Sequence, residues 1–369
     1  MTIEMGRSVK SWLGLLLLAV LLFGAGMASA VVIPGEGLPE PALDRSQPQV
    51  QAVMKTQDRH APGLLSKPGV VGVATGMAAD GRPGILLLVE SFDAARGAQI
   101  PAVLEGIPVM VRVTGKIVFR AKGGIPGAPA DDGSSSDQCS GDPTGRFSRP
   151  VPIGVSTGHP AITAGTIGVR VTDGGNVYAL SNNHVYADEN QGAFGDSVLQ
   201  PGAYDGGAEP GDGIGYLTDY EPIVFSTTAG NRMDAAIALS SSASLGRSTP
   251  CDGYGIPRST TVEAVINQNV KKYGRTTGLT KGRITAIHAM VNVSYGHGTA
   301  RYVDQLVIEP AGFSSGGDSG SLIVVDGKGR YKGDDRKPVG LLFAGSSLVT
   351  IASPIDPILE RFSVTIDGE

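Results

Sequence analysis

The stretch Gly316-Gly317-Asp318-Ser319-Gly320-Ser321 decides how the rest of the chain is interpreted. Glycine adopts turns that other residues resist, so Gly317 allows a tight loop that presents the Ser319 hydroxyl. In such a loop the backbone amides of Gly317 and Ser319 can point into one space, where they would bind an oxyanion. An ordinary polar turn is the alternative, because Gly, Asp and Ser are common turn residues. A nucleophilic role requires a base and an orienting acid elsewhere in the chain.

Two upstream residues meet this requirement. His184 follows the short apolar run 177–180, and Asp234 stands directly before the apolar segment 235–239. An aspartate at the start of a buried strand is costly unless another group pairs with it, and a histidine Nδ1–H is a natural partner. The chain order His, Asp, Ser differs from the orders found in subtilisin and in α/β-hydrolases. We therefore predict that His184, Asp234 and Ser319 form a catalytic triad.

The wording of the three motifs resembles a known family. Ser-Asn-Asn-His-Val (181–185), Met-Asp-Ala-Ala-Ile-Ala (233–238) and Gly-Asp-Ser-Gly (317–320) resemble the His, Asp and Ser motifs of trypsin-like, chymotrypsin-fold serine proteases. The surrounding sequence, such as Gly-Leu-Leu-Phe-Ala-Gly (340–345), is most similar to a bacterial secreted branch that is distantly similar to the plant narrow-leaf protein. The resemblance covers roughly residues 150–365.

The resemblance implies a substrate-binding site as well as a triad. It implies that Phe313 forms the floor of the primary pocket, and that Ala344 and Gly345 form its wall and pair with the substrate backbone. No acid stands at Phe313, so a preference for Lys or Arg is not supported. We expect small or apolar side chains before the cleaved bond. Arg149 is followed by Pro150 and by no Ile-Val-Gly-Gly start, so activation by a new amino terminus that pairs with Asp318 is not expected.

Composition favours many short strands over long helices. The 369 residues include Gly 54 and Pro 24, hydrophobic residues make up 41% and aromatic residues only 5%. The predicted fold class is mainly β, a chymotrypsin-like double β-barrel preceded by a small α+β domain. In the leading part we expect a helix over 49–60 that ends before Pro62 and a hairpin across 80–83. Later we expect a hairpin turn at 173–175, separate strands at 283–288 and 290–294, and a closing helix over 354–362.

The chain divides into four predicted regions. Residues 1–30 have the basic start, the apolar run and the Ala-Ser-Ala end of an export signal, with an uncleaved membrane anchor as the alternative. Residues 31–122 form the small leading domain, a hypothetical pro-region or docking unit, and 123–149 are a Gly/Pro/Ser linker suited to processing. Residues 150–365 form the protease domain, with barrel one at about 150–245 and barrel two at about 260–365. The two cysteines, Cys139 and Cys251, permit one disulfide in an exported protein.

The functional prediction is a secreted or periplasmic serine endopeptidase that acts on protein or peptide substrates. We expect no cofactor and no metal site, since the chain lacks a His-Glu-x-x-His motif and zinc-type cysteine spacing. A formal net charge of −5 without a basic stripe gives no reason to expect nucleic-acid binding, and we expect no stable membrane insertion after signal removal. Two alternatives stay open: a non-catalytic binding protein on a protease fold, and a protease limited to processing itself.

Overall fold

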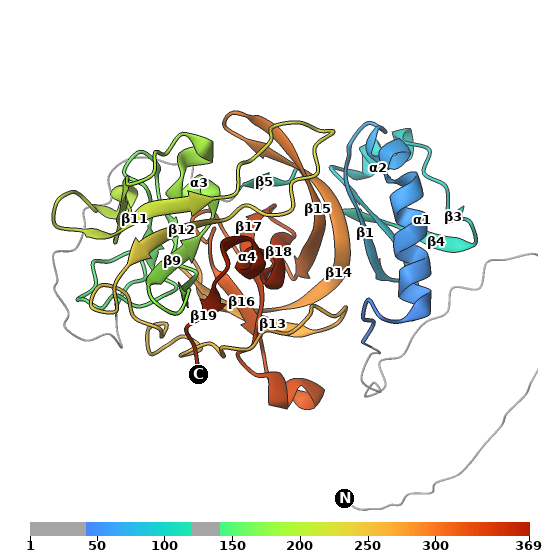
Figure 1. Cartoon of the computed structure of the whole chain (residues 1–369). Coiled ribbons are helices and arrows are strands. Elements are labelled where there is room, and N and C mark those ends of the chain that lie inside the picture. The colour runs from blue at the N-terminus through green and yellow to red at the C-terminus, as the bar shows by residue number, and fades with distance from the viewer. Residues whose placement is uncertain (1–41, 120–140) are drawn as a thin grey trace, which may run out of the picture. The chain divides into compact units, whose positions relative to one another are not determined.

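Short strands make up most of the described chain, which confirms the prediction of a mainly β protein. The structure is a computed structural model that describes residues 42–119 and 141–369 (Figure 1). The predicted export signal and most of the predicted linker lie outside these residues. The described residues belong to one compact unit. Among the described helices, none combines the length and the apolarity that crossing a membrane would require.

The described strands, in chain order, are β1 (Val70–Met77), β2 (Pro83–Val89), β3 (Val103–Leu104), β4 (Ile107–Val113), β5 (Val118–Phe119), β6 (Ser156–Thr157), β7 (Gly165–Thr166), β8 (Val169–Thr172), β9 (Val177–Ser181), β10 (Ser197–Leu199), β11 (Gly213–Tyr220), β12 (Ala236–Ser240), β13 (Asn269–Gly274), β14 (Gly278–Tyr295), β15 (Gly298–Glu309), β16 (Leu322–Val325), β17 (Pro338–Gly345), β18 (Thr350–Pro354) and β19 (Thr365–Ile366). The described helices are α1 (Pro48–Leu65), α2 (Phe92–Gly97), α3 (Asn183–Tyr186) and α4 (Ile355–Phe362), with short 3₁₀ turns η1 (Asp188–Asn190), η2 (Ala203–Asp205) and η3 (Gly329–Asp334).

Six of the later strands form a closed ring. The hydrogen-bonded order runs β13-β16-β17-β18-β15-β14, and β14 pairs back onto β13. Alternate residues of β14 are buried, as expected for a strand with one face toward a core. The predicted separate strands 283–288 and 290–294 are wrong, because β14 runs through both. Its register with β15 shifts three times, and His288 takes a positive φ of 53°, so the strand bends without ending.

The earlier strands form a second sheet in the order β10-β11-β12-β9-β8-β19. An isolated bridge joins Gly158 to Leu199 of β10, beside the small β6–β7 pair. The hairpin turn between β8 and β9 is confirmed: the Asp173 carboxylate accepts the Gly175 and Asn176 amides at 2.8 and 2.7 Å. The closing helix is confirmed as α4, and β19 follows it and pairs with β8.

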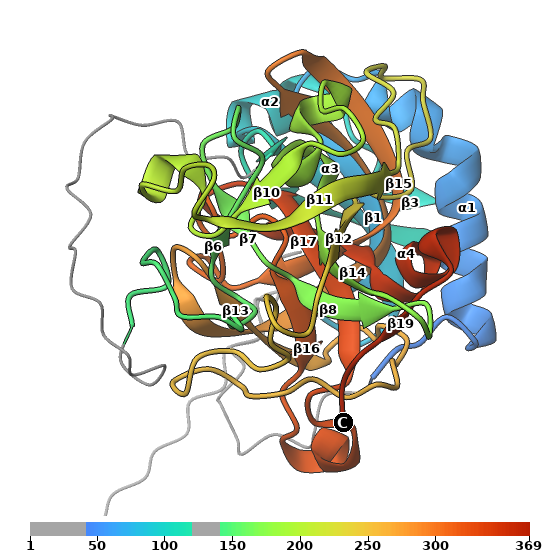
Figure 2. The same cartoon turned by 60° about the vertical axis from the view of Figure 1, so that its left-hand side comes forward.

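The leading residues extend the later sheet. Strand β1 pairs antiparallel with β14, from Gly72↔Val291 to Gly76↔Ala286, and the order continues through β2, β4 and β3. Helix α1 packs on β1 and β2 (Figure 1, Figure 2). The hairpin over 80–83 is confirmed. The sheet therefore crosses from the predicted leading domain into the predicted protease region, while the boundary at 122 lies outside the described residues.

Helix α1 corrects one prediction. It does not end before Pro62 but includes that residue and continues to Leu65. Proline removes one helical hydrogen bond, yet Ala61, Leu64 and Leu65 are buried in the cluster that packs on Val73 and Leu87. Burial of this apolar face keeps the last turn helical.

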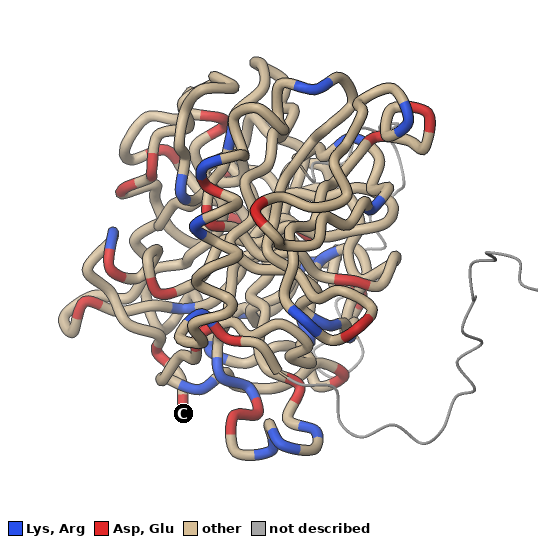
Figure 3. The backbone as a smooth tube through the Cα atoms, turned by 90° about the vertical axis from the view of Figure 1, so that its right-hand side faces the viewer, with Lys and Arg blue, Asp and Glu red and all other residues tan. Residues whose placement is uncertain are grey.

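Charges of both signs are interspersed along the backbone (Figure 3). One cluster connects α1 to the bend in β14. His288 Nε2 lies 2.8 Å from Asp58 Oδ1 of α1, and His288 Nδ1 lies 2.9 Å from Asp304 Oδ1, which also pairs with Arg45. Burial alone would lower the pKa of His288, but the hydrogen bonds to Asp304 and Asp58 outweigh it, so its pKa is raised above 6.5.

We expect this cluster to make stability depend on pH. Because the folded pKa of His288 is raised, its contribution is fully present below the unfolded pKa and is lost as pH rises through the folded value. Urea unfolding between about pH 6 and pH 9 should give a free energy of unfolding that falls with pH, with a shallower fall in His288→Gln. The exposed His297→Gln serves as control. Equal slopes in wild type and His288→Gln would contradict the assignment.

Candidate active site

The pairing of β9 with β12 brings His184 and Asp234 together. Ser181 at the end of β9 lies opposite Ala236 at the start of β12. His184 follows Ser181 by three residues and lies in the first turn of α3, and Asp234 precedes Ala236 by two residues. Both residues therefore lie at the same edge of the sheet. His184 Nδ1 is 2.6 Å from Asp234 Oδ2, and the His184 amide donates to Oδ1 at 3.2 Å. Their side chains are 2% and 0% exposed, which makes this a buried acid–imidazole pair.

Tyr295, which the sequence analysis did not identify, donates a further hydrogen bond to Asp234. The Tyr295 hydroxyl donates to Asp234 Oδ2 at 2.8 Å, and the Tyr302 hydroxyl lies 2.8 Å from that of Tyr295. Burial, with the charge of Asp234, raises the pKa of both tyrosines far above the ordinary value, so they stay neutral donors. A buried carboxylate requires such donors to remain ionised. No local sequence signal marks Tyr295, because its place depends on the register of β14.

The loop 316–321 has the backbone that the sequence predicts. Gly317 has φ +96° and Gly320 has φ +93°. A Cβ on Gly320 would lie 2.1 Å from Ser181 Oγ and 2.3 Å from Thr166 O, so only glycine fits there. Among the described residues, the Asp318 and Gly320 amides donate to Ser315 O and Leu342 O. Within the same residues, the Gly317 and Ser319 amides have no acceptor, so they are available to a ligand.

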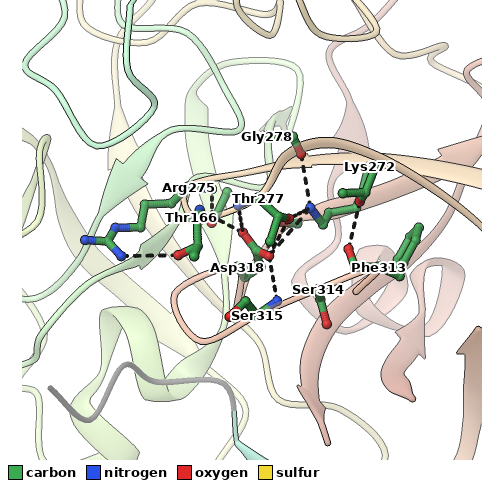
Figure 4. Close-up of polar contacts among 12 residues, drawn as sticks. Thr166, Lys272, Arg275, Thr277, Gly278, Phe313, Ser314, Ser315 and Asp318 are labelled. Carbon is green, nitrogen blue, oxygen red and sulfur yellow. Dashed lines mark hydrogen bonds and ion pairs between the residues drawn. The ribbon is translucent and has the colours of Figure 1, made fainter. Parts of the chain in front are cut away.

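A buried lysine, Lys272, pairs with the aspartate of this loop. Asp318 accepts hydrogen bonds from the Thr276 and Ser315 amides at 2.8 and 2.9 Å and from the Thr277 hydroxyl at 2.7 Å. Lys272 Nζ forms an ion pair with Asp318 Oδ2 at 3.6 Å, and both side chains are 0% exposed (Figure 4). Burial lowers the pKa of Lys272, while the charge of Asp318 opposes that shift. Lys272 supplies a positive charge to Asp318 from within the chain, and sequence reasoning missed it.

The loop lies against the edge that carries His184. The Thr166 amide donates to Ser319 O at 2.7 Å, and the Ser181 hydroxyl donates to Thr166 O at 2.8 Å. Ser319 itself is fully buried, and its Oγ lies 3.4 Å from Phe343 O. Within the described residues, His184 Nε2 is buried without a hydrogen-bond partner. The structure thus pairs His184 with Asp234. It does not show the hydrogen bond from the Ser319 hydroxyl to His184 Nε2 that completes a catalytic triad.

The predicted substrate-binding residues lie in two settings. Ala344 and Gly345 stand at the end of β17, where they pair with Phe119 and Val118 of β5. Phe313 is only 1% exposed and belongs to the apolar core of the closed ring, with Lys272 Nζ 5.8 Å from its ring centre. Its role as a pocket floor stays a prediction.

Two further predictions concern a disulfide and a metal site. Cys139 lies outside the described residues, so its bond to Cys251 stays a prediction, although Cys251 is not a free cysteine. Across residues 42–119 and 141–369, no group of His, Cys, Asp and Glu has an arrangement that would hold a metal ion.

Comparison with known proteins gives one family and several solved structures. Residues 246–351 match the family model described as the Nal1 C-terminal domain. That match includes Ser319 and confirms the predicted likeness to the narrow-leaf protein over this stretch, less than a third of the chain. A comparison with curated proteins gives no significant match.

Bacterial serine proteases are among the structural neighbours. Thermobifida fusca protease A matches with a TM-score of 0.42 and 18% identity over 59% of this chain and 99% of its own. Nocardiopsis protease matches with a TM-score of 0.41 and 18% identity over 58% and 98%. A glutamic acid specific serine protease matches with a TM-score of 0.41 and 22% identity over 58% and 100%.

The buried ion pair between Lys272 and Asp318 predicts that Lys272→Met strongly lowers stability. Removal of the cation leaves the Asp318 charge buried, so the free energy of unfolding should fall by about 3 kcal/mol. Chemical denaturation monitored by circular dichroism measures this change. Lys281→Met is the matched control, because its ion pair with Asp326 has the same separation of 3.6 Å but Lys281 is half exposed. A loss no larger than that of the control would show that Asp318 does not depend on Lys272.

Proposed function

We propose that this chain is an exported serine endopeptidase with a chymotrypsin-like double β-barrel. The observation that carries the proposal is the buried His184–Asp234 pair beside a glycine-rich loop that holds Ser319. The closed six-stranded ring supports the second barrel, and the β10-to-β19 sheet supports the first. Export rests on the sequence of residues 1–30.

The proposed reaction begins when the Ser319 hydroxyl turns from Phe343 O to His184 Nε2. Ser319 Oγ then attacks the carbonyl carbon of the peptide bond, and its proton passes to Nε2. The imidazolium that results is stabilised by Asp234, which also accepts hydrogen bonds from the Tyr295 hydroxyl and the His184 amide. His184 then gives the proton to the leaving nitrogen as the C–N bond breaks. Water attacks the acyl-enzyme by the same route and restores Ser319.

The negative oxygen of the tetrahedral intermediate would bind to the amides of Gly317 and Ser319. Such donors are typically worth about 3–4 kcal/mol each, because they are fixed before charge develops. Asp318 and Lys272 would act indirectly by holding the loop so that both amides face the same space.

Labelling with a fluorophosphonate probe tests the activated serine. We expect time-dependent labelling of the wild-type chain, none in Ser319→Ala, and a labelling rate about ten-thousand-fold lower in Asp234→Asn, since the amide favours the wrong imidazole tautomer. Ser315→Ala is the matched control, because that residue holds the loop through its backbone amide. Labelling that persists in Ser319→Ala would contradict the proposal. A well-folded chain that never labels would favour the alternative of a binding protein.

A further inference from the structure

Two tyrosines of the β14–β15 hairpin lie on the same buried face, beside the carboxylate of Asp234. The register places Tyr295 opposite Gly298 and Val291 opposite Tyr302. Opposite residues share a face of a sheet, and so do alternate residues of one strand, so both tyrosine side chains leave the hairpin on one side. Tyr302 is fully buried, and Tyr295 is 8% exposed.

The two tyrosine hydroxyls can donate in only one order. An ionised carboxylate only accepts hydrogen bonds, so the single proton of the Tyr295 hydroxyl lies in its 2.8 Å bond to Asp234 Oδ2. The 2.8 Å contact between the two hydroxyls must then use the proton of Tyr302. Tyr302 therefore donates to Tyr295, and Tyr295 donates to Asp234. In such a chain each bond polarises the next, which strengthens the last donation to the carboxylate.

This tyrosine chain ends on the carboxylate oxygen that the imidazole also uses. His184 Nδ1 lies 2.6 Å from Asp234 Oδ2, whereas the His184 amide donates to Oδ1. A hydroxyl that donates to Oδ2 draws negative charge away from that oxygen, which leaves less charge to stabilise a protonated imidazole. The tyrosine chain therefore opposes protonation of His184 before the reaction and favours the neutral ring that a general base requires.

Aromatic packing holds the tyrosine chain in place. The Tyr295 ring stacks on Phe119 at 5.2 Å with an interplanar angle of 11°, and it meets Phe225 edge-on at 5.7 Å. The Tyr302 ring centre lies 4.6 Å from that of Phe343. A water molecule that replaced either hydroxyl would have to enter this apolar packing, where few polar partners are available to it.

We propose that Tyr295 and Tyr302 are positioning residues for the reaction of Ser319, and that their hydroxyls set the pH above which His184 acts as a base. This inference rests on the proposed function and adds the control of its pH dependence. Neither tyrosine hydroxyl contacts the reacting atoms, and both act through Asp234. Loss of the Tyr295 hydroxyl leaves more negative charge on Oδ2, so His184 then protonates at a higher pH.

A second acid–imidazole pair lies near the tyrosine chain and needs its own control. Glu189 of η1, whose charge acts on Tyr302, accepts the His297 ring nitrogen at 2.7 Å and the His297 amide at 3.2 Å. His297 is half exposed, so its own titration falls in the same pH range. His297→Gln therefore accompanies the tyrosine variants, and we expect it to leave the titration of His184 unchanged.

The pH dependence of fluorophosphonate labelling tests the role of the tyrosine chain. We expect the acid limb of the rate profile to move up by about one pH unit in Tyr295→Phe and by less in Tyr302→Phe. The double variant should match Tyr295→Phe alone, because Tyr302 acts only through Tyr295. Tyr186→Phe is the matched control, since Tyr186 is fully buried and its hydroxyl contacts Thr157 at 3.5 Å.

An acid limb that stays in place in both single variants would overturn the inference, and so would a limb that moves equally in Tyr186→Phe or His297→Gln. Circular dichroism checks that each variant folds. If Tyr295→Phe does not fold, the smaller shift in Tyr302→Phe decides the question.

An NMR titration separates this inference from the proposed function. In the Ser319→Ala chain with isotope-labelled histidine, the ring nitrogens of His184 report protonation without any reaction. We expect His184 to protonate about one pH unit higher after Tyr295→Phe and at an unchanged pH after Tyr186→Phe. This shift, in a chain whose Ser319 form never labels, would overturn the endopeptidase and keep the tyrosine chain. Labelling that depends on Ser319, with no shift in either experiment, would overturn the tyrosine chain and keep the endopeptidase.

Discussion

The buried carboxylate of Asp234 is the constraint on which the site depends. It accepts hydrogen bonds from the His184 ring nitrogen, the His184 amide and the Tyr295 hydroxyl. His184 lies in α3, and Tyr295 lies at the end of β14. An ionised carboxylate without such partners would be very costly in a core where its exposure is zero. The interaction therefore ties α3 to β14, and the same three donors that make Asp234 tolerable also fix the orientation of the imidazole.

A second buried carboxylate, that of Asp318, holds the loop of Ser319 in place. Asp318 draws together the Thr276, Thr277 and Ser315 groups, and Lys272 supplies the opposing charge. Because Lys272 stands on β13 of the closed ring, the contacts that hold the loop come from within the described fold. This arrangement agrees with the absence from the sequence of the start motif that a newly freed amino terminus would need.

The sequence predicted local features well and long-range ones poorly. Short motifs single out His184, Asp234 and the glycine-rich loop, whose catalytic role stays a prediction. The Asp173 turn and α4 were predicted correctly because turn and helix signals are local. Tyr295 and Lys272 were missed, since each acquires its role from strand pairing across tens of residues. The end of α1 and the merging of two predicted strands into β14 were wrong because burial outweighed the breaker signal of Pro62 and the irregular register around His288.

The most direct test of the central claim is a crystal structure of the chain after reaction with a fluorophosphonate. We predict phosphorus bound to Ser319 Oγ, a phosphoryl oxygen within hydrogen-bond distance of the Gly317 and Ser319 amides, and His184 Nε2 facing the adduct while Nδ1 keeps its hydrogen bond to Asp234. An adduct on another residue, or amides of Gly317 and Ser319 that point away from the phosphoryl oxygen, would contradict it.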